Sequence, residues 1–142
     1  MIIKKTPLYN QHIEQGGTMV EFAGYHLPIT YSSIKNEHNA VRQKVGIFDV
    51  SHMAEFFISG ESATRFLENI TVNDVAKLSV GQVHYSLMCN KNGGIIDDLL
   101  LYKKDNGYMM VVNAANHQKD LKWLQNNKDN KNLFIKDISK ET

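Results

Sequence analysis

The spacing of apolar residues in the second part of the chain predicts an alternating series of strands and helices. Residues 61–70 place apolar side chains at i, i+3, i+4 and i+7, and residues 116–127 place Leu121 and Leu124 on the inner side of a second helix. Short apolar runs bounded by turn residues predict strands at 52–60, 83–90, 95–103, 108–113 and 132–138. This order predicts an α+β fold with a mixed or antiparallel sheet, helices on one face, and a split βαβ-like unit with an extra hairpin.

The pattern before residue 52 is less regular. The first 30 residues are rich in turn formers, which break the apolar positions into short pieces. Ser33 predicts the N-cap of a helix with Ile34, Val41 and Val45 on its apolar side, and Gly46 is expected to end it.

The predicted hairpin between residues 83 and 103 turns on the sequence KNGG. Its Asn92-Gly93 pair is a strong signal for a tight two-residue turn. Both residues are expected to adopt positive φ, because that type of turn requires it.

Composition and charge narrow the class of protein. The chain has 142 residues, 42% hydrophobic and 22% charged, which suits about one soluble globular domain with a core. The net charge of +1, without a basic run, gives no reason to expect nucleic acid or a membrane surface as a partner. A single cysteine, Cys89, suits a reducing compartment, so we expect a cytoplasmic location.

Two adjacent carboxylates lie inside the strand predicted at 95–103. Alternation places Asp97 on one face of the strand, and it places Asp98 on the other face together with Leu100 and Tyr102. The aspartate beside Tyr102 is expected to be desolvated or held by hydrogen-bond donors, and either condition shifts the pKa of a carboxyl group. The residues alone leave two interpretations open, a structural acceptor of hydrogen bonds and a functional carboxylate.

Other candidate signals are weak. Six scattered histidines lack the spacing of metal ligands, so no metal is expected. Ser51 and His52 are adjacent on an extended segment and therefore point apart, which argues against a nucleophile pair. Asn113 follows an apolar strand, where its amide could cap a turn or contact the edge of an aromatic heterocycle.

Several separated blocks together resemble the aminomethyltransferase of the glycine cleavage system, the T-protein family. They read TPLYNQH, VEFAGYHLPITYSSI, EHNAVRQKVGIFDVSHM, VHYSLMCNKNGGIIDDLLLYK and VVNAANHQKDLKW, in the family's order. The resemblance implies transfer of the one-carbon unit from the aminomethyl-lipoyl H-protein to tetrahydrofolate, with release of ammonia and no metal. Folate and the lipoylated H-protein are the partners that it implies.

The resemblance also implies the residues of the site. The family's critical aspartate is placed at Asp98 rather than Asp97, because Asp98 shares its strand face with Tyr102. The folate-contacting residues that the resemblance implies are Met53, Phe57, Tyr85, Asp98, Tyr102, Val111 and Asn113. Residues 1–52 would be the incomplete start of the family's first domain, and residues 53–142 the second, folate-contacting α+β domain.

Length is the main departure from the family pattern. T-proteins are much longer, and the arginines and glutamate that complete their folate site would follow residue 142. The chain is therefore expected to be a fragment with weak or absent folate binding and no appreciable turnover alone. Two alternatives remain: a non-catalytic folate-binding module of a related family, and a folded interaction module without a ligand.

Overall fold

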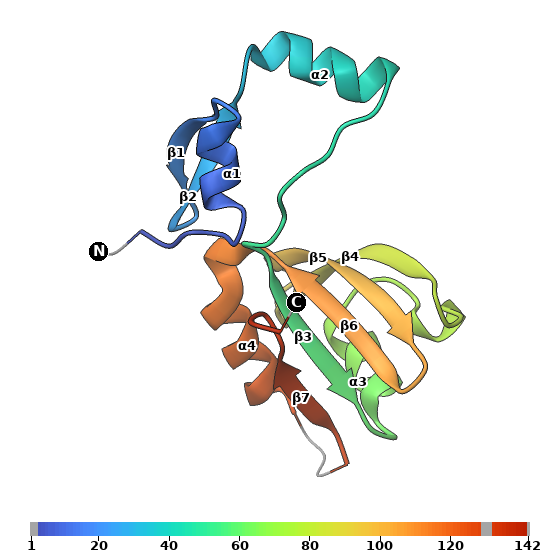
Figure 1. The fold of residues 1–142 in the computed structure, drawn as a ribbon. Coiled ribbons are helices and arrows are strands. Elements are labelled where there is room, and N and C mark those ends of the chain that lie inside the picture. Colours follow the sequence, from blue (N-terminus) through green and yellow to red (C-terminus); the bar gives the residue numbers. More distant parts are fainter. Residues whose placement is uncertain (1–2, 129–131, 142) are drawn as a thin grey trace. The chain divides into compact units, whose positions relative to one another are not determined.

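The computed structural model describes residues 3–128 and 132–141 and divides the chain into two compact units, residues 1–52 and 53–142. Figure 1 shows the elements of both units along the chain. Each unit is described by itself below.

Unit 1 contains more regular structure than its sequence pattern predicts. It comprises two helices and an antiparallel hairpin: α1 (Tyr9–Glu14), β1 (Thr18–Phe22), β2 (Tyr25–Thr30) and α2 (Ile34–Gln43). The hairpin turns at Ala23 and Gly24, which have φ of 51° and 79°. Two successive positive φ values are the signature of a tight hairpin turn, so the turn-rich interpretation of this region missed a β-hairpin as well as α1.

Helix α2 begins where the sequence predicts and ends earlier. The side chain of Ser33 accepts a hydrogen bond from the backbone N–H of Asn36 and caps the helix. The helix ends at Gln43, so the prediction that Gly46 stops it is wrong. A Cβ atom at Gly46 would lie 2.5 Å from Cγ2 of Val41, which shows that this glycine permits close packing instead.

A partly buried polar cluster joins three segments of unit 1. The Nδ1 atom of His12 lies 2.6 Å from the hydroxyl of Tyr31, and its Nε2 atom lies 2.8 Å from Oδ2 of Asp49. Burial opposes ionisation of Asp49, but hydrogen bonds from His12 and Ser51 outweigh it and hold the pKa of this carboxyl below its ordinary value. The cluster thereby fixes α1 against the end of β2 and the segment that follows α2.

Glu37 organises the entry into α2. Its Oε1 atom accepts hydrogen bonds from the hydroxyl of Thr30 and from the backbone N–H groups of Tyr31, Ser32 and Ser33. The donors, led by the Ser32 N–H, lower the pKa of Glu37 from 4.5 to about 2. Because the folded-state pKa is depressed, the charge of Glu37 stabilises the fold fully above pH 4.5, and this contribution is lost as the pH falls towards 2.

We therefore expect the amide proton shifts of Tyr31, Ser32 and Ser33 to titrate together with a midpoint near pH 2. In Glu37→Gln this titration should vanish, because the side chain keeps an acceptor oxygen but loses the ionisable proton. Nuclear magnetic resonance across pH 1.5–6 measures it, with Glu21→Gln on β1 as the matched control. A shared midpoint near pH 4.5 would contradict the anchoring role of the carboxylate.

Unit 2 confirms the predicted order of elements. It contains a five-stranded sheet and two α-helices, whose bounds are β3 (Ala54–Ser59), α3 (Ala63–Ile70), β4 (Val83–Cys89), β5 (Ile95–Lys104), β6 (Gly107–Val112), α4 (His117–Asn126) and β7 (Phe134–Asp137). Short 3₁₀ turns lie at Val75–Lys77 and Ala114–Asn116.

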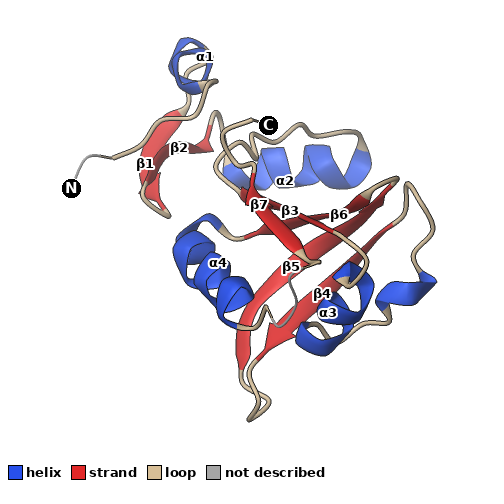
Figure 2. Ribbon diagram, turned by 90° about the horizontal axis from the view of Figure 1, so that it is seen from below, coloured by secondary structure: helices blue, strands red, loops and turns tan. Residues whose placement is uncertain are grey.

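The strands lie in the order β4-β5-β6-β3-β7, and every pair of neighbours is antiparallel (Figure 2). Strands β6 and β7 are both antiparallel to β3, so they run parallel to each other on either side of it. The unit β6–α4–β7 is thus a split βαβ unit, and β4–β5 is the extra hairpin.

One face of this sheet forms the core with both helices. The inward-facing residues of the central strands are buried with those of α3 and α4: Ala54, Phe56, Ile58, Leu99, Leu101, Met110, Val112, Ala63, Phe66, Leu67, Ile70 and Leu124. All four apolar positions predicted for α3 are buried, which confirms the helical spacing read from the sequence. The prediction that the helices cover one face is confirmed.

The β4–β5 turn differs from the predicted two-residue type. Gly93 has φ of 80°, whereas Asn92 is not among the residues with positive φ. The side chain of Asn90 accepts hydrogen bonds from the N–H groups of Asn92 and Gly94, and the N–H of Gly93 donates to the Asn90 carbonyl. These bonds support a longer loop that needs only one residue with positive φ, so the expectation for Asn92 is wrong.

Candidate functional site

The sheet face opposite the helices carries the candidate site. We call it the open face and define it by Tyr85, Asp98, Leu100, Tyr102 and Val111, which alternate with the buried positions of their strands. Tyr85 is 56% exposed and Leu100 is 37% exposed. The open face therefore presents large apolar and aromatic side chains to a possible ligand.

Asp98 is held on the open face by two side-chain donors. The hydroxyl of Tyr85 donates to Oδ2 of Asp98 at 3.2 Å, and Nδ2 of Asn113 donates to Oδ1 at 2.8 Å. Asp98 itself is exposed, so of the two conditions expected for this carboxylate, bonding to donors is the one that the structure shows. Three residues from β4, β5 and the end of β6 thus meet at one carboxylate.

The other predicted positions lie in neighbouring rows across the same face. Leu100 is opposite Tyr85 on one side and Val111 on the other, and Met109 is opposite both Tyr102 and Phe57. Side chains that are directly opposite in adjacent strands are in contact range. Tyr85 and Asn113 therefore bond to Asp98, Val111 lies in the next row with Leu100, and Tyr102 and Phe57 lie in the row after that with Met109.

One predicted residue lies outside the sheet, and two residues between the predicted positions were not predicted. Met53 is half-buried and immediately precedes β3, outside the paired residues of that strand. Leu100 and Met109 lie between the predicted residues, although neither was predicted as part of the site. Strand alternation combined with the hairpin register could have found both.

Asp97 occupies the opposite side of β5 and is 5% exposed. It accepts hydrogen bonds from the backbone N–H of Asn113 at 3.1 Å, from Nδ2 of Asn113 at 2.9 Å and from Nδ2 of Asn116 at 2.7 Å. Burial opposes its ionisation, but these donors and Asp120 together hold the pKa of Asp97 below its ordinary value. Asp97 is therefore buried and bonded to donors, whereas Asp98 is exposed on the open face.

Asn113 connects the two carboxylates. Its side-chain nitrogen donates to Oδ1 of Asp97, to Oδ1 of Asp98 and, at 3.3 Å, to the backbone carbonyl of Asp98. One amide thus fixes the position of the exposed carboxylate against the buried one.

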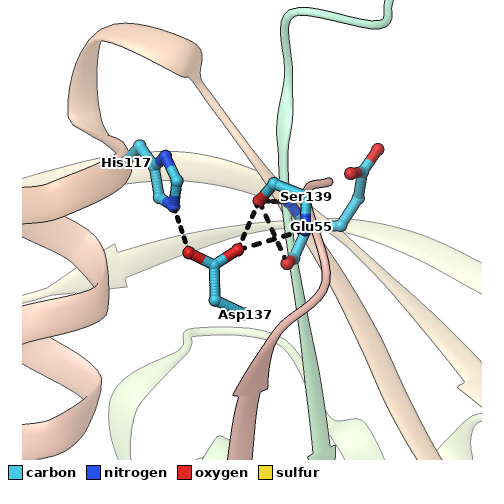
Figure 3. A network of polar contacts seen from close by, with 4 residues as sticks. All are labelled: Glu55, His117, Asp137 and Ser139. Atoms are coloured by element: carbon cyan, nitrogen blue, oxygen red, sulfur yellow. Dashed lines mark hydrogen bonds and ion pairs between the residues drawn. The ribbon is translucent and has the colours of Figure 1, made fainter. Parts of the chain in front are cut away.

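A second polar network ties the segment after β7 to the rest of unit 2. Figure 3 shows Asp137 between His117 and Ser139, with Nε2 of His117 at 2.7 Å from Oδ2 and the Ser139 hydroxyl at 2.6 Å from Oδ1. The Ser139 Oγ atom also accepts a hydrogen bond from the backbone N–H of Glu55. In a nucleophilic triad the histidine lies between serine and aspartate, so this order indicates a tether and not a catalytic triad.

Unit 1 contains a hollow of about 630 Å³ with largely apolar walls, including Phe22, Phe48 and Val41. The polar residues His12, Tyr31 and Asp49 in its lining bond to one another. Thr30 and Glu37, which also line the hollow, bond to each other.

Within residues 3–128 and 132–141, no three His, Cys, Asp or Glu side chains come together as possible metal ligands. Within the same residues, no helix has the length and apolar character needed to cross a membrane.

Comparison with protein families matches residues 8–142 to the family described as the GCVT N-terminal domain. The chain belongs to this family. The family membership confirms the resemblance to the glycine cleavage T-protein that the sequence blocks indicate.

Named relatives in this family are aminomethyltransferases. The chain is 48% identical over 140 residues to that of Thermoanaerobacter pseudethanolicus, 47% identical over 138 residues to that of Staphylococcus carnosus and 46% identical over 142 residues to that of Geobacillus thermodenitrificans. These alignments cover 98%, 96% and 99% of the chain. They cover only 38%, 38% and 39% of the relatives, so the chain spans about two fifths of the relatives' length.

A solved structure shares the fold. The crystal structure of glycine cleavage system aminomethyltransferase T from Bartonella henselae matches with a TM-score of 0.89 at 34% identity, over 96% of this chain and 38% of that one. The α+β fold of the family is therefore present in this N-terminal portion.

Proposed function

We propose that this chain is the folate-contacting N-terminal portion of a glycine cleavage aminomethyltransferase. The whole enzyme would transfer the one-carbon unit of the aminomethyl-lipoyl arm of the H-protein to tetrahydrofolate and release ammonia. The observation that carries the proposal is the meeting of Asp98, Tyr85 and Asn113 beside an exposed apolar surface in a member of this family.

The residues of the open face fit a reduced pterin. A carboxylate has about four acceptor positions. Tyr85 and Asn113 use one on each oxygen of Asp98, which leaves acceptor capacity for the N–H groups of a flat heterocycle. The rows that contain Leu100, Tyr102 and Met109 offer the apolar wall that such sites use to exclude water.

Asp98 is the proposed catalytic residue. When tetrahydrofolate is bound, its nitrogens accept the one-carbon unit. A fixed carboxylate beside them stabilises positive charge that develops during transfer, and its position is set in advance by Tyr85 and Asn113. It could also hold a proton for a group within hydrogen-bond reach, about 3 Å.

Tyr85, Asn113, Tyr102, Val111, Phe57 and Met53 are proposed as folate-contacting residues. Residues 1–52 are proposed as the incomplete start of the first domain, and residues 53–142 as the second domain. The lipoylated H-protein is the proposed protein partner. A cytoplasmic location is proposed from the single cysteine and the ordinary composition.

The 142-residue chain alone should bind folate weakly and show no appreciable turnover. Binding sites for small ligands bury roughly 70–90% of the ligand surface, whereas Tyr85 remains 56% exposed here. Calorimetric titration with tetrahydrofolate should give a dissociation constant above the micromolar range, and a submicromolar value would contradict the expectation.

The location of weak binding can be tested separately with millimolar 5-formyltetrahydrofolate, a chemically stable folate. Amide shifts should concentrate on Tyr85, Asp98 and Asn113. Tyr85→Phe, which removes one donor to Asp98, should weaken the response. Tyr9→Phe in unit 1 makes the same chemical change at a residue that the proposed site does not include, and it should have no effect. Shifts confined to unit 1, or none at all, would overturn the proposed site.

A further inference from the structure

A fully buried carboxyl group lies behind the candidate site on α4. Asp120 is 0% exposed. As an ionised carboxylate, it would have no hydrogen-bond donor at either side-chain oxygen among the residues that the structure describes. Burying an isolated charge in such a position costs roughly several kcal/mol of free energy. A buried carboxyl group without donors therefore tends to take up a proton. Asp120 therefore needs a partner that accepts a hydrogen bond.

Asp97 is that partner. Its carboxylate lies within hydrogen-bond reach of Asp120 and already accepts bonds from Asn113 and Asn116. When two buried carboxyl groups are adjacent, the state in which they share one proton is more stable than the state in which both are ionised. Burial, the hydrogen bond to Asp97 and the charge of Asp97 raise the pKa of Asp120 to about 8.

We infer that protonated Asp120 donates to Asp97 and acts as a positioning residue, because Asp97 fixes Asn113 and Asn113 fixes Asp98. Each link is short: Asp97 and Asn113 are joined by bonds of 2.9 and 3.1 Å, and Asn113 reaches Asp98 at 2.8 Å. Loss of the proton would place two like charges side by side. Asp97 would then move or draw on other donors, and the Asn113 amide would lose its fixed position.

Three other charged residues on α4 and β7, Lys119, His117 and Lys136, have partners of their own. The Nζ atom of Lys119 donates to the backbone carbonyl of Ile96 at 2.6 Å, and this charge opposes the upward shift in the pKa of Asp120. His117 pairs with Asp137 of β7. On β7, the side chain of Lys136 pairs with Glu141. Asp97 is thus the group that sets the state of Asp120.

The direct test follows the side-chain amide signals of Asn113 by nuclear magnetic resonance from pH 5 to pH 10 in the 142-residue chain. In the unmodified chain these signals should shift with a midpoint near pH 8. Asp120→Asn should abolish the shift, because its neutral amide can donate to Asp97 at every pH. Asp120→Ala should displace the Asn113 signals throughout, because it offers no donor.

Asp105→Asn is the matched control, since it makes the same chemical change at an exposed turn between β5 and β6 and should keep the midpoint. The inference is overturned when Asn113 does not titrate near pH 8, or when the same titration persists in Asp120→Asn. If Asp120→Ala does not fold, the comparison of the unmodified chain with Asp120→Asn decides the matter.

The consequence for ligand affinity rests on the proposed function. Affinity for 5-formyltetrahydrofolate should fall at least about threefold between pH 7 and pH 9.5 in the unmodified chain, and it should stay level in Asp120→Asn. A level profile in both proteins would overturn the coupling between Asp120 and the ligand. Absence of folate binding in both would count against the proposed function, whereas the Asn113 titration tests the positioning role without any ligand.

Discussion

Asp98→Asn in a full-length aminomethyltransferase that carries this N-terminal sequence should keep the fold and lower the turnover number at least about tenfold, a barrier increase of roughly 1.4 kcal/mol. Asparagine has nearly the same shape and keeps one acceptor oxygen, which can take the bond from Tyr85 or the bond from Asn113. It cannot supply the negative charge that stabilises a developing positive charge. The measurement is the rate of methylenetetrahydrofolate formation with saturating aminomethylated H-protein.

Asp105→Asn provides the control for a general effect of charge, because Asp105 is exposed in the β5–β6 turn. Its turnover should equal that of the unmodified enzyme. Circular dichroism and the unfolding midpoint should match for all three proteins. An Asp98→Asn enzyme with unchanged turnover would refute the assignment of Asp98 as the catalytic carboxylate.

The sequence pattern predicted unit 2 well because the apolar positions in the sequence are the positions that pack in the core of the structure. Ala63, Phe66, Leu67 and Ile70 have helical spacing and are all buried in the structure. On β5, alternation separated Asp97 from Asp98, and the structure buries the first while exposing the second. Amphipathic elements that face a single core obey such periodicities closely.

The sequence pattern predicted unit 1 less well, because contacts between residues far apart in the sequence organise this unit. Helix α1 has six residues, and its one buried member is His12, whose partners Tyr31 and Asp49 are far away in sequence. The β1–β2 hairpin turns at Ala23 and Gly24, and alanine rarely adopts the positive φ that it has here, so the pair lacks the usual signal of a tight hairpin turn. The helix was missed because the contacts of His12 leave no local pattern in the sequence.

In the candidate site, too, some residues were predicted from the sequence and others were not. Tyr85, Tyr102 and Val111 follow from the family resemblance and agree with strand alternation. The support behind them was not predicted: Asp120 and Asn116 fall in a polar helix segment, where a charged residue is normally expected to face solvent. Their role depends on the turn at Ala114–Asn116, which directs the chain behind β5.

Gly60→Ala should destabilise unit 2 strongly. Gly60 has φ of 106°, and a Cβ atom there would lie 2.0 Å from the backbone oxygen of Asn132. That oxygen precedes β7, whose Phe134 pairs with Ser59 of β3. The added methyl group would strain its own backbone and push β7 away from β3, so we expect a loss of about 3 kcal/mol or more.

Gly81→Ala separates the two contributions to that loss. Gly81 has φ of 86°, and a Cβ atom there meets nothing within 4 Å, so only the conformational cost of about 1–2 kcal/mol should appear. Urea unfolding can be followed by the fluorescence of Trp123, the single tryptophan, which packs against the core of unit 2. Equal losses in the two variants would show that the approach of Asn132 to Gly60 contributes nothing. A larger loss of stability in Gly60→Ala would indicate that the pairing of β7 with β3 requires a residue without a side chain at position 60, where the backbone of Asn132 approaches closely.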